Sequence, residues 1–213
     1  MVDAVRRAYP GLDVEDRGGQ VVIAGELVLH DDGVVLDHYL IEIELPRDGP
    51  RAGMAVVREV GGRIPRIEDR HVNDLDGTCC LMVTDQFWFE HPQGMDVVDF
   101  IDGPVRGFFV SQSHFDVGGG WPYGEYGHGC DGIVQFYRAL FGVEQEAVVL
   151  DLLRAIGGPR LRGRRVCPCG GGRAARDCHG PVLSDLLERI PPHTLHASIV
   201  AVTISAALPE RVA

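Results

Sequence analysis

Three β-rich segments stand close together in the first third of the chain, and the short connections between them restrict how they can pair. They are residues 20–29, 38–45 and 54–60, each bounded by glycine, proline or aspartate. Parallel neighbours need a crossover of a dozen or more residues, usually a helix, and these connections are shorter. The segments therefore predict an antiparallel meander. We expect an α+β fold with a four-stranded meander and helices at one end and on one face.

Apolar residues at helical spacing predict helices through most of the remaining chain. Gly103-Pro104 should kink or restart one of them, and Asp131 and Gly142 can cap another. The predicted helices cover residues 1–12, 95–110, 132–141, 144–156 and 181–190. Gly157-Gly158-Pro159 predicts a boundary between a first domain, 1–158, and a C-terminal segment, 159–213. The apolar, β-branched residues 197–207 should either return to the first domain or meet another subunit.

The bulk composition excludes several classes of protein. A formal net charge of −11 argues against non-specific binding to nucleic acid, which needs a basic face. No apolar run approaches the roughly 20 residues of a membrane span, and the N-terminus lacks the apolar core of a signal peptide. The six cysteines, several in metal-like spacing, favour a reducing compartment over disulfides. We expect a cytoplasmic protein with no nucleic-acid or membrane partner.

A cluster of metal-binding residue types follows a basic run, Arg160 to Arg165. Cys167-Pro168-Cys169 and Cys178-His179 have the spacing of a tetrahedral zinc site with three thiolates and one imidazole. The pattern also resembles the SEC-C motif, with Gly171 in place of serine. Because all four positions would be filled by protein, the predicted zinc is structural. The alternatives are a redox pair at Cys167 and Cys169 for the cluster, and, for the basic run, a docking site for an acidic partner or a solvated linker.

A second group of residues has the composition of a thiol active site. His71-Val72-Asn73 precedes a turn at Gly77, and Cys79-Cys80-Leu81 follows it. A thiolate can attack an acyl group, and an asparagine amide can donate to the resulting oxyanion. The structural alternatives are a buried core thiol, an Asx turn at Asn73 and a purely architectural role for His71.

The order of these motifs resembles the ubiquitin-conjugating enzyme family. In that family a strand leads through a proline-rich turn to another strand, then to His-Pro-Asn, a glycine turn, Cys-Leu, and a tryptophan eight residues past the cysteine. The corresponding segments here are residues 45–50, 71–73, 77–81 and Trp88. Val72 stands for the proline, and the loop before the cysteine is one residue shorter. The position of Trp88 selects Cys80, rather than Cys79, as the nucleophile.

The resemblance implies an acyltransferase that carries a ubiquitin-like protein as a thioester on Cys80. Asn73 would stabilise the oxyanion, and His71 would shape the loop. The implied partners are the ubiquitin-like protein, its activating enzyme and a protein with an acceptor amine. Residues 121–129, with Glu125 and His128, are similar to a loop of prokaryotic members found in antiphage operons. The loop at 121–130 predicts either a gate over Cys80 that helps to deprotonate the amine or a self-packed turn. Two other functions stay open: an inactive adaptor of the same fold, and a cysteine hydrolase pairing Cys80 with His71 or His128.

Overall fold

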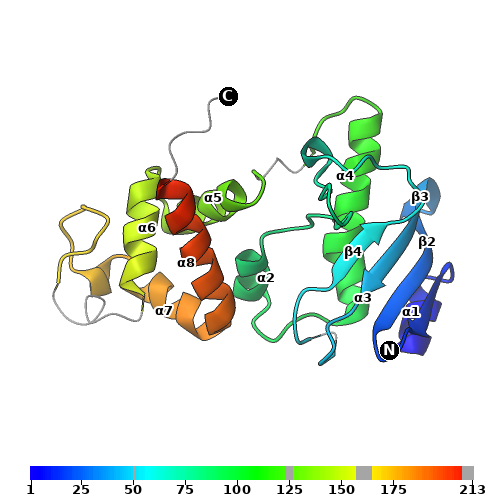
Figure 1. Ribbon diagram of the computed structural model, residues 1–213, viewed down its shortest axis with the longest axis horizontal. Coiled ribbons are helices and arrows are strands. Elements are labelled where there is room, and N and C mark those ends of the chain that lie inside the picture. The colour runs from blue at the N-terminus through cyan, green and yellow to red at the C-terminus, as the bar shows by residue number, and fades with distance from the viewer. Residues whose placement is uncertain (50, 123–126, 157–164, 208–213) are drawn as a thin grey trace. The chain divides into compact units, whose positions relative to one another are not determined.

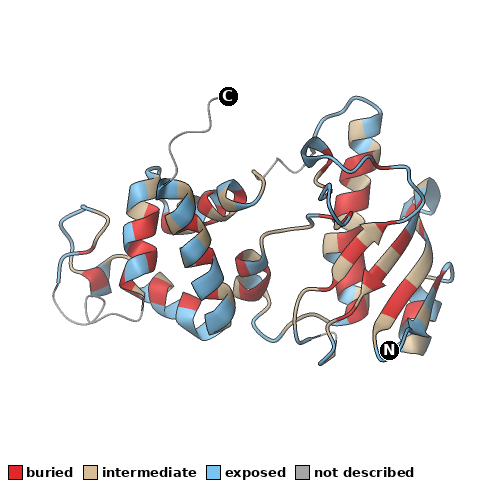
Figure 2. Ribbon diagram, in the orientation of Figure 1, coloured by how far each residue is buried: buried red, intermediate tan, exposed pale blue. Residues whose placement is uncertain are grey.

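The computed structural model describes residues 1–49, 51–122, 127–156 and 165–207 and divides into two compact units (Figure 1). The first, here called the sheet unit, comprises Met1–Met82 and Gln93–Glu125. The second, the helical unit, comprises Val83–Pro92 and Tyr126–Ala213. Each unit has buried side chains of its own (Figure 2).

The sheet unit contains one antiparallel sheet with the strand order β1-β2-β3-β4. The predicted four-stranded meander with flanking helices is therefore confirmed. Three of its strands correspond to the β-rich segments, whereas the edge strand β1 was not assigned from the sequence. Its elements are α1 (Val2–Ala8), β1 (Leu12–Asp16), β2 (Val21–Asp31), β3 (Val34–Glu44), β4 (Val56–Glu59), η1 (Glu68–Arg70), α3 (Val97–Phe100), η2 (Ile101–Val105) and α4 (Arg106–Asp116).

Strands β2 and β3 form a long hairpin whose turn is the dipeptide Asp32-Gly33. Both turn residues have positive φ, 46° and 79°, as a two-residue hairpin turn of matching twist requires. One face of the hairpin packs against α4, where the rings of Tyr39 and Phe109 lie 4.7 Å apart. This packing fixes α4 relative to β3.

The helix predicted over residues 95–110 is interrupted at Pro104, as expected. Proline lacks the N–H that an α-helix needs and clashes with the preceding turn. The chain accommodates it with a single π-helical turn, η2, between α3 and α4. The interruption lets α4 continue as a separate helix along the sheet.

The helical unit confirms the helices predicted over residues 132–141, 144–156 and 181–190. The helix predicted over residues 1–12 is α1 of the sheet unit, and it ends at Ala8, before β1 begins at Leu12. Gly142 ends α5 in the left-handed conformation as predicted, but Asp131 lies inside α5 rather than at its N-cap, which is Gly129. The apolar tail forms α8, which packs against α2, α5 and α6 and so returns to helices of residues 1–158. No helix in the described ranges is long and apolar enough to cross a membrane. The elements are α2 (Thr84–Glu90), α5 (Cys130–Phe141), α6 (Glu146–Ala155), η4 (Ala175–Asp177), α7 (Gly180–Arg189) and α8 (Pro192–Ala207).

The predicted boundary after residue 158 falls in residues 157–164, which lie outside the described residues, as does most of the basic run Arg160 to Arg165. By packing, α2, α5 and α6 share a unit with the C-terminal segment. The predicted division of roles between 1–158 and 159–213 stays a prediction.

Candidate functional site

The adjacent cysteines lie on a short extended segment that is held from two sides. The Cys79 N–H donates to the Val57 carbonyl of β4 at 2.8 Å, and Cys79 forms an isolated bridge with Val72. The Cys80 N–H donates to the His71 carbonyl, also at 2.8 Å. Because neighbouring side chains of an extended segment point to opposite sides, Cys79 is buried and Cys80 is exposed. Of the two thiols, Cys80 is the one that a large substrate can reach.

The surroundings of Cys80 favour a protonated thiol at neutral pH. Partial desolvation by the neighbouring loops raises the pKa of Cys80, and the carboxylates of Asp76 and Glu68 raise it further. Burial raises the pKa of Cys79 to about 12. A cysteine paired with an imidazolium would show the opposite shift, since a nearby cation lowers a thiol's pKa. This environment is unlike that of a Cys-His hydrolase.

The raised pKa predicts an unusual pH dependence for alkylation of Cys80 by iodoacetamide. Only the thiolate reacts, so the rate should rise about tenfold per pH unit and continue to rise beyond the ordinary thiol value of 9.0. Mass spectrometry of peptides after timed labelling measures this for each cysteine. Cys79→Ala serves as the control and should leave the profile of Cys80 unchanged. A plateau near neutral pH would instead reveal a thiolate–imidazolium pair.

Asn73 builds the loop that leads to Cys80. Its Oδ1 accepts from the Leu75 N–H at 2.9 Å, and its backbone N–H donates to the Thr78 carbonyl at 2.9 Å. The first bond is the Asx turn considered from the sequence. This bond uses only Oδ1 of Asn73 and leaves Nδ2 out of the turn. Nδ2 is the atom that would donate to an oxyanion.

Gly77 is required in the same loop for two reasons. Its φ is +71°, and a Cβ on it would lie 2.8 Å from Nε of Arg66. A side chain at Gly77 would therefore push Arg66 away or distort the turn. The turn predicted at Gly77 therefore requires glycine, because of both its positive φ and the close approach of Arg66.

His71 occupies the left-handed region, with φ 51° and ψ 37°. This conformation costs a non-glycine residue about 1–2 kcal/mol, so surrounding contacts must hold it in place. The His71 ring lies edge-on to Trp121 with centroids 4.8 Å apart, and Trp121 also contacts Phe115 of α4. These contacts support an architectural role for His71.

The structure describes only part of the loop predicted to act as a gate. Residues 123–126, including Glu125, lie outside the described residues. Trp121 belongs to the sheet unit, whereas His128 belongs to the helical unit. The predicted roles of Glu125 and His128 in proton transfer stay predictions.

The four predicted metal ligands come together in the helical unit. One ligand atom each from Cys167, Cys169, Cys178 and His179 lies within 4.8 Å of all the others. The Sγ atoms of Cys169 and Cys178 are 3.6 Å apart, and Nδ1 of His179 is 3.3 Å from Sγ of both Cys167 and Cys178. Tetrahedral zinc with bonds of about 2.3 Å to sulfur and about 2.0 Å to nitrogen places such atoms about 3.5–3.8 Å apart. The cluster therefore fits a metal ion of this kind.

The residues around the cluster orient its ligands. Nε2 of His179 lies 2.9 Å from the Phe141 carbonyl at the end of α5, so it carries the proton and Nδ1 faces the thiols. The Gly171 N–H bonds to Cys169 and, with smaller contributions from the other thiols, lowers the pKa of Cys169 to about 7. Burial, together with the neighbouring thiols, raises the pKa of Cys178 to about 11. Metal binding would displace the protons that these groups share.

Two pairs of buried polar residues were not predicted from the sequence. Arg70 and Gln112 are 9% and 0% exposed and are hydrogen-bonded to each other. In the helical unit, buried Asp85 accepts from the Tyr137 hydroxyl at 2.7 Å, and burial raises the pKa of Asp85. Arg70 stood next to the His-Val-Asn motif, but nothing in its spacing linked it to Gln112, 42 positions away.

Comparison of the chain with family models, with curated proteins and with solved structures finds no match in any of the three.

Proposed function

We propose that this chain is a ubiquitin-like-protein conjugating enzyme that carries its cargo as a thioester on Cys80. The observation that carries the proposal is the exposure of Cys80 at the end of the Asn73 loop, where its backbone N–H donates to the His71 carbonyl. The loop follows the last strand of an antiparallel meander, the order in which the resembling family places its own active site. As part of the same proposal, we infer a role in bacterial antiviral defence, which rests on the resemblance of residues 121–129 to a loop of prokaryotic members of that family.

The reaction would consist of two acyl transfers. First, the Cys80 sulfur attacks the carbonyl carbon of the modifier's C-terminal glycine, which is held as a thioester on the activating enzyme. A new sulfur–carbon bond forms, the old one breaks, and the activating enzyme's thiol leaves with the proton from Cys80. Next, an amine of the target attacks the same carbon, an amide forms, and Cys80 recovers a proton as it leaves. In both steps Nδ2 of Asn73 would donate to the tetrahedral oxyanion.

The charges around Cys80 suit the second transfer. Asp76 and Glu68 are the charged groups that act on the thiol. Negative potential attracts a lysine ammonium group and keeps Cys80 protonated between reactions. The same carboxylates would oppose a permanently ionised thiolate. The electrostatics therefore favour transfer to an amine over hydrolysis by a Cys-His pair.

The metal cluster would have a structural role within this enzyme. Cys167, Cys169, Cys178 and His179 supply four ligands, which leaves no open position for a substrate. The bound ion would contribute folding free energy to the segment that carries these ligands. We infer zinc as the ion and a SEC-C-like character for the segment, with no part in acyl transfer.

Two alternative functions make different demands on Cys80. An adaptor would bind a ubiquitin-like protein without using the thiol. A hydrolase would need an imidazole at the thiol, whereas the charged groups that shift the pKa of Cys80 are carboxylates.

Intact mass spectrometry after incubation with a ubiquitin-like protein, its activating enzyme and ATP tests the proposal. The expected adduct disappears on treatment with a thiol reductant, is absent from Cys80→Ala and persists in Cys79→Ala. Binding of the modifier with no adduct would support the adaptor. Cleavage of a modifier fusion that depends on Cys80 would support the hydrolase.

A further inference from the structure

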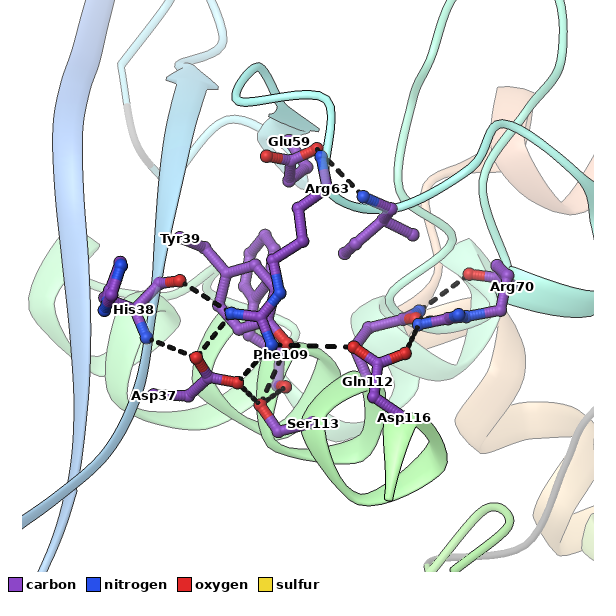
Figure 3. A network of polar contacts seen from close by, with 11 residues as sticks. Asp37, His38, Tyr39, Glu59, Arg63, Arg70, Phe109, Gln112, Ser113 and Asp116 are labelled. Carbon is purple, nitrogen blue, oxygen red and sulfur yellow. Dashed lines mark hydrogen bonds and ion pairs between the residues drawn. The ribbon is translucent and has the colours of Figure 1, made fainter. Parts of the chain in front are cut away.

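The segment before Cys80 is fixed to α4 by a reciprocal pair of buried side chains (Figure 3). Nε of Arg70 donates to Oε1 of Gln112 at 2.8 Å, and Nε2 of Gln112 donates back to the Arg70 carbonyl at 2.7 Å. Nη2 of Arg70 also donates to Asp116 at 2.7 Å, and its guanidinium lies over the Phe115 ring. One helix thus holds both the side chain and the backbone of Arg70.

A second set of bonds fixes the start of the same loop (Figure 3). The Glu59 carboxylate accepts from the N–H groups of Gly61, Arg63 and Ile64. The Arg63 guanidinium pairs with Asp37 of β3, contacts Asp116 at 3.6 Å and holds the pKa of Asp37 well below its usual range. The Asp116 carboxylate therefore contacts the guanidinium groups of both Arg63 and Arg70, and these contacts anchor the loop to β3 and α4.

A single residue, His71, connects the anchored Arg70 to Cys80. Arg70 is followed by His71, whose left-handed backbone must be held by its neighbours. The His71 carbonyl then accepts the Cys80 N–H. A shift of the Arg70 backbone would move that carbonyl and with it the backbone of Cys80.

We propose that Arg70 and Gln112 are positioning residues for Cys80, acting through the Arg70 backbone and the strained His71. They keep the exposed Cys80 thiol in its partly desolvated position beside Asp76 and Glu68 and align it for acyl transfer. The inference that they set the environment of the thiol stands independently, whereas their effect on transfer rests on the proposed function.

Two complementary variants test the pair. Gln112→Glu keeps an acceptor for Arg70 Nε but loses the donor to the Arg70 carbonyl. Arg70→Met keeps the carbonyl bond but loses the guanidinium contacts, and it decides the question if Gln112→Glu does not fold. Ser111→Ala is the matched control, because Ser111 is buried on the same helix and its hydroxyl bonds to Gly107 of α4 itself.

In both variants the rate of Cys80 alkylation should rise and the kcat for thioester formation should fall. Alkylation of Cys80 in the protein alone, at about pH 8, should become several-fold faster because a loosened thiol is better solvated and ionises more readily. The kcat for thioester formation should fall roughly ten- to a hundredfold with little change in KM for the charged activating enzyme, since alignment is lost but the docking surface is not. Ser111→Ala should change neither.

Unchanged alkylation and unchanged kcat in folded variants would overturn the proposal. Equal acceleration of alkylation at Cys80 and at buried Cys79 would also overturn it, because it would show general unfolding rather than a local change at Cys80. If wild type forms no thioester, the proposed function fails, but the alkylation rates still decide whether Arg70 and Gln112 set the environment of Cys80.

Discussion

Replacing Cys178 by alanine is expected to abolish binding of the proposed zinc ion and to unfold the segment around η4 and α7. Cys178 lies within bonding range of two other ligand atoms, at 3.6 Å from Cys169 and 3.3 Å from His179. Structural zinc contributes roughly 10–16 kcal/mol in small zinc peptides, comparable with the total stability of a domain at about 5–15 kcal/mol. Elemental analysis should find about one zinc per wild-type chain and none in the variant. Hydrogen exchange should accelerate most in residues 165–189.

Cys130→Ser provides the matched control for this experiment. Cys130 is a partly buried cysteine of the same unit, but its Sγ donates to the Ala201 carbonyl of α8 and lies outside the cluster. The control should retain the metal and the slow exchange of residues 165–189. Equal exchange in wild type, Cys178→Ala and chelator-treated protein would show that packing alone folds the segment.

If Cys80 carries the proposed thioester, introducing a lysine beside the Cys80 loop is expected to make the protein modify itself. All 20 lysine and arginine positions of these 213 residues are arginines. A guanidinium stays protonated and does not attack thioesters under these conditions, whereas a lysine amine can. The Arg66 side chain lies against Gly77, three residues before Cys80. Arg66→Lys should therefore produce an amide adduct that resists reductant.

The wild-type chain should give only the reductant-labile adduct under the same conditions. Arg7→Lys on α1 adds an amine to another element and tests whether closeness to the loop matters. Combining Arg66→Lys with Cys80→Ala should remove the resistant adduct, because the amide must form from the thioester. A resistant adduct on a wild-type side chain would contradict this account of the acceptor.

The predictions from the sequence were most accurate where the connectivity of the chain restricts the fold. Short connections required antiparallel pairing of β2, β3 and β4, and Pro104 required an interruption between α3 and α4. Strand β1 escaped prediction because its sequence, Leu-Asp-Val-Glu-Asp, is short and acidic, as suits an exposed edge. Asp131 was assigned as a cap because it precedes an apolar run, but α5 begins at Cys130, two residues before the predicted start at Gly132.

For the sites, the sequence determined which residues are adjacent, and the tertiary structure decided their environment. The spacing of Cys167, Cys169, Cys178 and His179 was enough to predict a metal cluster, because a short loop can bring such neighbours together. The alternation of side chains likewise separated exposed Cys80 from buried Cys79. Only the packing of α4 against the sheet brought Gln112 to Arg70 and so fixed the backbone before Cys80. Hydrogen bonds between distant residues leave no periodic trace in a sequence, since each needs one polar partner at a place that only the folded chain defines.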